Sequence, residues 1–149
     1  MSTIKNQIIE AFTERAAALS ALPVGRVSKT EKDIKNPVMS VYDTGMDIVQ
    51  EAGNDYTQRR CQIRLIAVFE AVGENASFAA NELAGEIIKT IMTGVNGFDN
   101  TFNGLANATT EPDVQIDYPE TGKNKITIIC QFPILYTVKT GDPYSLPFS

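Results

Sequence analysis

The sequence contains no histidine, which removes the commonest general base at neutral pH and the commonest metal ligand. It also lacks the glycine-rich phosphate-binding patterns G-x-x-x-x-G-K-[ST] and G-x-G-x-x-G. Glu82 and Glu86 stand at helical spacing on a polar helix side, and Asp43, Asp47 and Glu51 match no calcium loop. We therefore expect no enzyme, no catalytic or metal-binding residue, and no cofactor.

Cysteine is scarce, with two residues in the chain. Cys61 and Cys130 each fall on the apolar side of a predicted strand, and neither has a C-x-x-C partner. The N-terminal stretch MSTIKNQIIEAF has neither a continuous apolar region nor a small-residue cleavage site, so we interpret it as an amphipathic helix and not as a signal peptide. No stretch approaches the ~20 apolar residues of a membrane span. We expect buried free thiols in a reducing, cytosolic compartment.

The composition is ordinary for a soluble globular protein, with 43% hydrophobic and 21% charged residues. A chain of 149 residues can bury a core without disulfides or a structural metal. Its formal net charge of −5 argues against a general binder of the nucleic-acid backbone, which needs a broad basic surface. We predict a single domain over residues 1–149.

Two helices are predicted from apolar residues at helical spacing. The first is capped by Ser2 or Thr3 and runs to about Ser20. The residues that follow helical spacing in it are Ile4, Ile8, Phe12, Arg15 and Leu19. The second has Asn75 as its N-cap and Gly94 as its C-terminal stop. Its apolar face comprises Ala80, Leu83, Ala84, Ile87, Ile88 and Ile91.

Strands are predicted on both sides of the second helix. Two short candidates lie between residues 24 and 45, separated near Asn36 and Pro37, and QRRCQIRLIAVFEA alternates as the longest strand of this half. The stretches DVQIDYP and KITIICQFPILYTVK should form a hairpin across the turn ETGKN. Pro133 lacks an N–H group, so its strand is expected at a sheet edge or bulged. This order predicts an α+β fold, a mainly antiparallel β-sheet with an N-terminal helix and a central helix packed on it.

Two segments show no such periodicity. Residues 94–110 form a long loop, rich in glycine and asparagine, whose only charge is Asp99. Loops of this length tend to be functional or mobile, and a covered loop end and a binding loop are both open readings here. Residues 140–149, with two prolines, are interpreted as a C-terminal arm. The apolar anchors expected in the loop are Phe98, Phe102 and Leu105.

The strand beginning at Gln58 has one polar face, which bears two arginines. One interpretation is a solvated sheet face on which each arginine pairs with a cross-strand acid such as Asp113, Asp117 or Glu70. Another is a protein–protein surface, where arginine is favoured because its planar fork binds carboxylates at two points. A nucleic-acid groove would need more basic residues and interleaved aromatic side chains.

The assembled order resembles the tail terminator proteins of long-tailed bacteriophages, a family of small minor tail or tail-completion proteins. The resemblance covers almost the whole chain. It rests on the helix IKNQIIEAFTERAAAL, on RRCQIRLIAVFEAVG running into ASFAANELAGEIIKTIM, and on the hairpin VQIDYPETGKNKITIICQFPILYTV with its DPYS tail. The family is not enzymatic, so the resemblance implies no catalytic residue.

The resemblance implies a virion structural protein of the tail or neck that is assembled in the host cytoplasm. Such subunits form a homo-oligomeric ring, typically a hexamer, that caps the head-proximal end of the tail tube. The ring terminates tube polymerisation and provides the docking surface for the head connector. The implied partners are the protein itself, the tail tube protein and a head-completion or connector protein, while DNA only passes through the lumen and no membrane is involved.

Candidate interface residues follow from this implication. The arginine-bearing strand face would meet acidic groups of a neighbouring subunit or of the tube, and the loop at 94–110 would contact the next ring. The candidates are Arg60, Gln62, Arg64, Phe98, Asp99, Phe102, Asn103 and Tyr144. The alternatives are another neck ring component, such as a head-completion or head–tail joining protein, and a small ligand-binding α+β domain.

Overall fold

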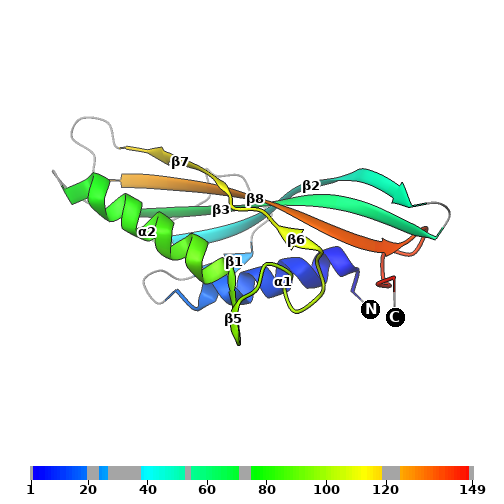
Figure 1. Cartoon of the computed structure of the whole chain (residues 1–149). Coiled ribbons are helices and arrows are strands. Elements are labelled where there is room, and N and C mark those ends of the chain that lie inside the picture. Colours follow the sequence, from blue (N-terminus) through cyan, green and yellow to red (C-terminus); the bar gives the residue numbers. More distant parts are fainter. Residues whose placement is uncertain are drawn as a thin grey trace.

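The computed structural model describes residues 2–19, 24–26, 38–52, 55–70, 75–118 and 125–147. Within these residues the sheet is long and twisted, and both helices lie on one side of it (Figure 1). The elements in chain order are α1 (Ile4–Ala17), β1 (Val24–Arg26), β2 (Val38–Ala52), β3 (Tyr56–Glu70), α2 (Asn75–Ile91), β4 (Thr93–Gly94), β5 (Gly97–Phe98), β6 (Ala108–Thr109), β7 (Asp113–Asp117) and β8 (Lys125–Lys139).

The main sheet has the order β1-β2-β3-β8-β6, and β7 pairs with β8 as well. Only the β1–β2 pair is parallel among the pairs that the structure describes. The β3–β8 register runs unbroken from Tyr56 opposite Lys139 to Glu70 opposite Lys125. The predicted α+β class and its mainly antiparallel sheet are confirmed, and so is the antiparallel pairing of β7 with β8. The turn ETGKN that was predicted to join these two strands lies outside the described residues.

β8 is a central strand, which corrects the prediction made from Pro133. Pro133 lies opposite Gln62 on one side without a register shift. On the other side β6 pairs only as far as Ile134 and β7 only from Gln131, so Pro133 falls in the gap between them. Its carbonyl accepts a hydrogen bond from Thr110 N–H at 3.1 Å. Because the N and C=O of one strand residue point to the same edge, the missing N–H faces the gap, where neither short strand needs it.

α1 begins where its sequence predicts. Thr3 is the N-cap, and its hydroxyl oxygen accepts a hydrogen bond from Asn6 N–H at 3.1 Å. An uncapped helix start would leave that donor without a partner. The helix buries a stripe made of Ile4, Ile8, Ile9, Phe12 and Ala16.

α2 also follows its predicted face, since Ala80, Ala84, Ile87 and Ile91 are buried. The predicted stop at Gly94 is wrong, however. The helix ends at Ile91, and Gly94 belongs to the two-residue strand β4. Its φ is not among the left-handed values, so it does not act as a helix cap. A Cβ at position 94 would lie 2.9 Å from the Asp99 Cβ, so glycine is required there by close approach.

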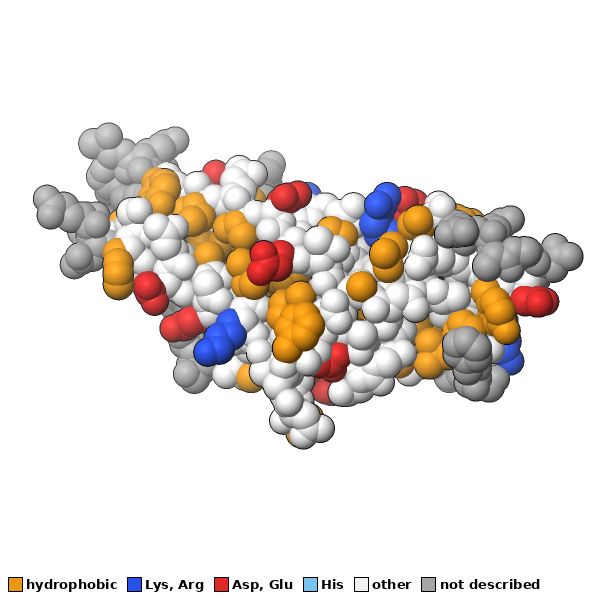
Figure 2. Space-filling model, viewed as in Figure 1, with side chains coloured by type: hydrophobic (Ala, Val, Ile, Leu, Met, Phe, Trp, Pro, Cys, Tyr) orange, Lys and Arg blue, Asp and Glu red, His pale blue; other side chains and the backbone are white. Residues whose placement is uncertain are grey.

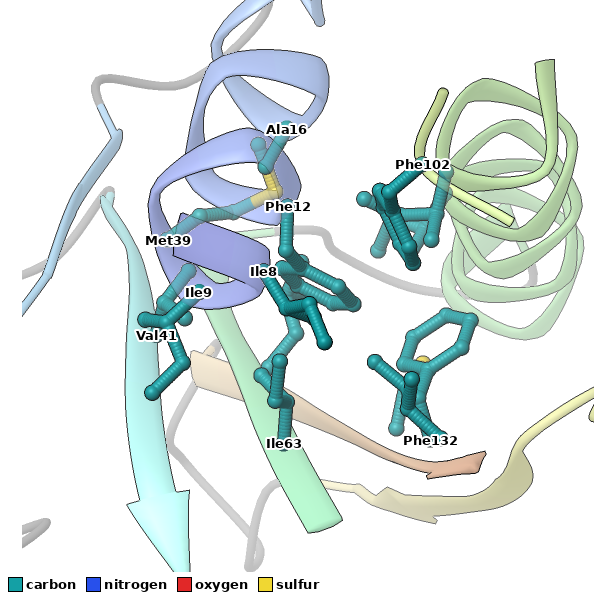
Figure 3. Close-up of a cluster of buried hydrophobic side chains, with 14 of the residues drawn as sticks. Ile8, Ile9, Phe12, Ala16, Met39, Val41, Ile63, Phe102 and Phe132 are labelled. Atoms are coloured by element: carbon teal, nitrogen blue, oxygen red, sulfur yellow. The ribbon is translucent and has the colours of Figure 1, made fainter. Parts of the chain in front are cut away.

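The core lies between the helices and one face of the sheet (Figure 3). Phe12 of α1 meets Phe132 of β8 edge-to-face, with ring centroids 5.1 Å apart. Phe102 also packs against Phe12, and the centroids of these two rings are 6.1 Å apart. Both cysteines are fully buried free thiols, as predicted. Burial raises the pKa of Cys61 and of Cys130 to about 12.

The opposite sheet face is not uniformly solvated. Ile66 and Val68 belong to the same alternate set of β3 residues as Arg60 and Arg64, yet they are only 1% and 3% exposed. Ser40, which lies opposite Ile66 in β2, is 4% exposed. Neither Ile66 nor Val68 belongs to the main core cluster. This half of the face is therefore a second, smaller buried region, while the half around the arginines is more open.

The C-terminal segment folds back and does not project as an arm over its described residues. Pro143 C=O accepts a hydrogen bond from Ile4 N–H at 2.9 Å, which joins the segment to the start of α1. Lys139 N–H donates to Ser145 C=O at 3.1 Å, and Leu146 packs against the core. None of the described helices has the length and apolar character needed to cross a membrane.

Candidate protein interaction surfaces

The arginine-bearing face of β3 has partners within the chain. Arg60 Nη2 forms an ion pair with Asp47 Oδ2 at 2.8 Å, across the β2–β3 pair. Their side chains are 43% and 54% exposed, so solvent screens this pair. The sequence predicted a cross-strand acid but suggested the wrong ones, because it did not show that β2 continues past residue 45 and places Asp47 opposite Arg60.

Arg64 lies in the middle of the same face, between Tyr42 and Gln131 on the flanking strands. Its Nε and Nη2 both lie 3.4 Å from Gln131 Oε1. The Gln131 amide in turn donates to Gln62 Oε1. Arg64 and Gln62 thus belong to one cross-strand network of side chains. That Arg60, Gln62 and Arg64 contact another protein stays a prediction.

The loop that follows α2 is held by Arg15 of α1. Arg15 Nη2 contacts Asp99 Oδ2 at 2.7 Å, while Nη1 donates to Asp99 C=O at 2.7 Å and to Ile91 C=O at 2.8 Å. The guanidinium also lies over the Phe102 ring, 4.4 Å from its centroid. One side chain therefore connects α1, the end of α2 and the loop, and we call this contact set the Arg15–Asp99 clamp.

Asp99 also organises the turn behind it. Asp99 Oδ1 accepts bonds from the Thr101 hydroxyl at 2.6 Å and from Thr101 N–H at 2.9 Å, and Oδ2 accepts one from Asn103 N–H at 3.0 Å. The Thr101 hydroxyl bond, together with these N–H groups and Arg15, holds the pKa of Asp99 well below its ordinary value of 3.8 despite partial burial. Asp99 was a candidate interface residue, but in the structure its carboxylate binds Arg15 and the turn that follows it.

The two phenylalanines of this loop have opposite environments. Phe102 is fully buried although its φ is +50°, so its side chain is part of the core and cannot contact a partner. Phe98, predicted as a second anchor, is 76% exposed and does remain available as a surface residue. Asn103 is exposed at φ +61°, and Leu105 is a partly buried anchor as expected.

An open groove lies between α2 and residues 93–111. Its volume is about 580 Å³. Gly85 leaves the groove open from α2, because a Cβ built there has no atom within 4 Å. The residues lining it are Gly85, Ile88, Lys89, Met92, Thr93, Phe98, Asn100, Thr109 and Glu111. The groove was not predicted from the sequence, although a glycine on the polar side of an otherwise regular helix was a signal for it.

A second apolar surface lies on the outer half of β2. Met46 is 43%, Ile48 57% and Val49 44% exposed, and we call these three residues the β2 strip. This surface was not predicted from the sequence, because the stretch MDIVQ does not alternate strictly between apolar and polar residues. The register shifts between Asp43 and Met46 and again between Ile48 and Gln50. The apolar side chains of this segment therefore do not fall on every second residue.

Other residues singled out in the sequence lie in the following positions. Asp43 forms an ion pair with Lys5 at 2.9 Å, so Asp43, like Asp47, is engaged with a basic side chain. Across the described residues no group of three or more His, Cys, Asp or Glu side chains is placed to hold a metal ion. Tyr144 is 44% exposed on the folded C-terminal segment and remains a surface residue. In the view of Figure 2, apolar side chains gather over α2, β7 and the centre of the subunit.

Comparison with known proteins gives no family. No family model matches the sequence, and no curated protein matches it. One solved structure, whose name states no function, is 19% identical over 88% of this chain and 92% of its own, with a TM-score of 0.44. A likeness at this level carries no argument about function.

Proposed function

We propose that this protein is a virion structural protein that forms a ring at the head-proximal end of a phage tail tube, stops tube growth there and presents a surface to the head connector. The proposal begins from the sequence resemblance to tail terminator proteins. It is compatible with the α+β fold described above, with both helices on one side of a long sheet.

The observation that carries the proposal is the presence of two separate apolar surfaces on one subunit. The groove beside α2 is concave, and the β2 strip is a line of exposed side chains on a different element. Exposed apolar patches mark interaction sites on soluble proteins. Two unlike patches are what a head-to-tail ring requires, because each subunit must present a different surface to each neighbour. The net charge of −5 suits a lumen through which DNA passes without being bound.

Tube capping tests the proposal directly. Purified protein is added to the cognate tail tube protein while it polymerises, and tube lengths are measured by electron microscopy. A terminator should shorten the tubes in proportion to its concentration and appear as a ring at one end. Tubes of unchanged length with no ring at their ends would contradict the proposal. A protein of similar size and charge serves as the control.

A neck ring other than the terminator is the nearest alternative. It would also assemble from copies of one chain, but it would leave tube growth unchanged and bind the head connector instead. A small ligand-binding domain is favoured by one observation, since the groove volume of about 580 Å³ lies within the range of roughly 300–1,000 Å³ that ligand sites occupy. That reading predicts a monomer whose melting temperature rises with a small molecule, and no effect on tubes.

A further inference from the structure

The sequence contains two asparagines that are followed by glycine, Asn96 before Gly97 and Asn103 before Gly104, and both pairs lie between α2 and β6. Such pairs are prone to deamidation, because a glycine has no Cβ to hinder its backbone nitrogen from approaching the preceding side-chain amide. Both asparagines are exposed. A difference in reactivity between them must therefore come from how the fold holds each glycine nitrogen.

The first pair lies at the tip of the β4–β5 hairpin, which projects away from both helices (Figure 1). The hairpin has only two residue pairs, and the one at the tip joins Gly94 to Gly97. Since both of these residues are glycines, no side chains pack across the tip. Val95, which begins the turn, is 93% exposed. Opening of the tip therefore costs little free energy and leaves the core undisturbed.

The second pair is held in the turn that Asp99 organises. Gly104 N–H donates to Thr101 Oγ1 at 3.2 Å, and Asn103 N–H donates to Asp99 Oδ2 at 3.0 Å. The Thr101 hydroxyl in turn donates to Asp99 Oδ1 at 2.6 Å. The Gly104 nitrogen cannot attack the Asn103 side chain until it leaves this network. Leaving it is costly, because one of the bonds is made to a charged carboxylate.

We propose that Asn96 is a site of spontaneous deamidation and that the folded chain protects Asn103 from the same reaction. Hydroxide removes the proton from Gly97 N–H, and the nitrogen then forms a bond to Asn96 Cγ. The bond from Cγ to Nδ2 breaks, and the nitrogen leaves as ammonia after taking a proton from water. Addition of water opens the resulting succinimide at one of its two carbonyls. The product is aspartate or isoaspartate, and the reaction involves no change of oxidation state.

Either product changes the hairpin. Each adds one negative charge to a chain whose formal net charge is −5. Isoaspartate also inserts an extra backbone atom into the turn, which disturbs the pairing of Thr93 with Phe98. Phe98 lines the groove beside α2, so the reaction alters one wall of that groove. The inference does not depend on the proposed function, because the chemistry needs neither a ring nor a tube.

Peptide mass spectrometry on the full chain tests the proposal. The protein is kept at mildly alkaline pH, either folded or unfolded in guanidinium chloride, and is sampled over time. Trypsin releases both pairs in the peptide 90–123, whose fragments locate the added mass, and the zero-time sample gives the background. Folding should slow the reaction at Asn103 by at least about tenfold and at Asn96 by less than about threefold. Comparison of each site with itself cancels the effect of its sequence neighbours.

Three variants separate the two sites. Asn96→Gln should abolish the more acidic species that anion-exchange chromatography resolves from the folded protein. Thr101→Val removes the hydroxyl that holds Gly104 N–H, so the reaction at Asn103 in the folded chain should become at least about threefold faster. Thr101→Ser keeps the hydroxyl and is the matched control, in which Asn103 should react as slowly as in the wild type.

The rates in the folded chain decide the outcome. A reaction at Asn103 as fast as at Asn96, or no reaction at Asn96, would overturn the proposal. It would also be overturned by a Thr101→Val chain in which Asn103 stays as slow as in the wild type, because the hydrogen bond to Gly104 would then not be the source of protection.

Discussion

The Arg15–Asp99 clamp predicts a large and specific loss of stability when its charge is removed. In Asp99→Asn the side-chain shape is kept, but one carboxylate oxygen is replaced by an NH2 group. This group is itself a hydrogen-bond donor and faces other donors. It then opposes either the Thr101 donors or those of Arg15 and Asn103. The Arg15 and Asp99 side chains are only 12% and 21% exposed, so water replaces little of what is lost.

The expected cost of Asp99→Asn is about 3 kcal/mol, at the lower end of the range for breaking a buried ion pair. With a urea m-value of about 2 kcal/mol/M, the unfolding midpoint falls by about 1.5 M. The matched control is Asp47→Asn, which removes the charge of an ion pair whose side chains are 43% and 54% exposed. It should cost less than about 1 kcal/mol. If Asp99→Asn lowered the midpoint no more than Asp47→Asn, the clamp would not be the stabilising contact described above.

The clamp also predicts how stability depends on pH. The pKa of Asp99 is lower in the folded chain than its ordinary value of 3.8, so its contribution is fully present above that value and is lost as the pH falls through the folded pKa. The difference in unfolding free energy between wild type and Asp99→Asn should therefore be constant from pH 7 to about pH 5 and shrink below about pH 4. Urea unfolding at each pH measures it. A constant difference down to pH 2 would contradict the lowered pKa.

Three further outcomes are expected. Gly85→Ala should raise the free energy of unfolding by up to about 1 kcal/mol, measured by urea unfolding, because it improves helix propensity where a Cβ has nothing within 4 Å. Gly94→Ala should lower it by about 2 kcal/mol in the same assay, since its Cβ would be forced against the Asp99 Cβ at 2.9 Å. Cys61 and Cys130 should react with a thiol reagent only as fast as the chain opens, because burial raises the pKa of each thiol to about 12; rapid labelling of the native protein would refute this.

Much of the fold could be predicted because its elements repeat their pattern many times. α2 places Ala80, Ala84, Ile87 and Ile91 at helical spacing, and β8 alternates buried and partly buried residues along its whole length. Pro133 misled the prediction because a proline reveals a missing donor but not which neighbour it faces. The gap between β6 and β7 is a property of two other strands, and no local pattern in β8 records it.

The candidate surfaces were less predictable because they depend on loops and on long-range pairing. Composition could not distinguish Phe98 from Phe102, since burial of Phe102 requires a left-handed backbone and contact with α1. Arg15 did leave a signal, because it stood on the apolar stripe of its helix, and Asp99 was the only charge in its loop. The pairing of these two residues could have been inferred from that coincidence. The partner of Arg60 could not, because it depends on a register shift within β2.

The attachment of α1 at both ends has a consequence for synthesis on the ribosome. Its first residue, Ile4, is tied to Pro143, and Arg15 near its end is tied to Ile91 and Asp99. α1 is made before all three of these partners, and Pro143 is the last of them in the chain. Until Pro143 has been made, the first residue of α1 lacks its backbone partner. A chain that ended soon after Lys139 would therefore lose the attachment of α1 at Ile4 as well as its own C-terminal segment.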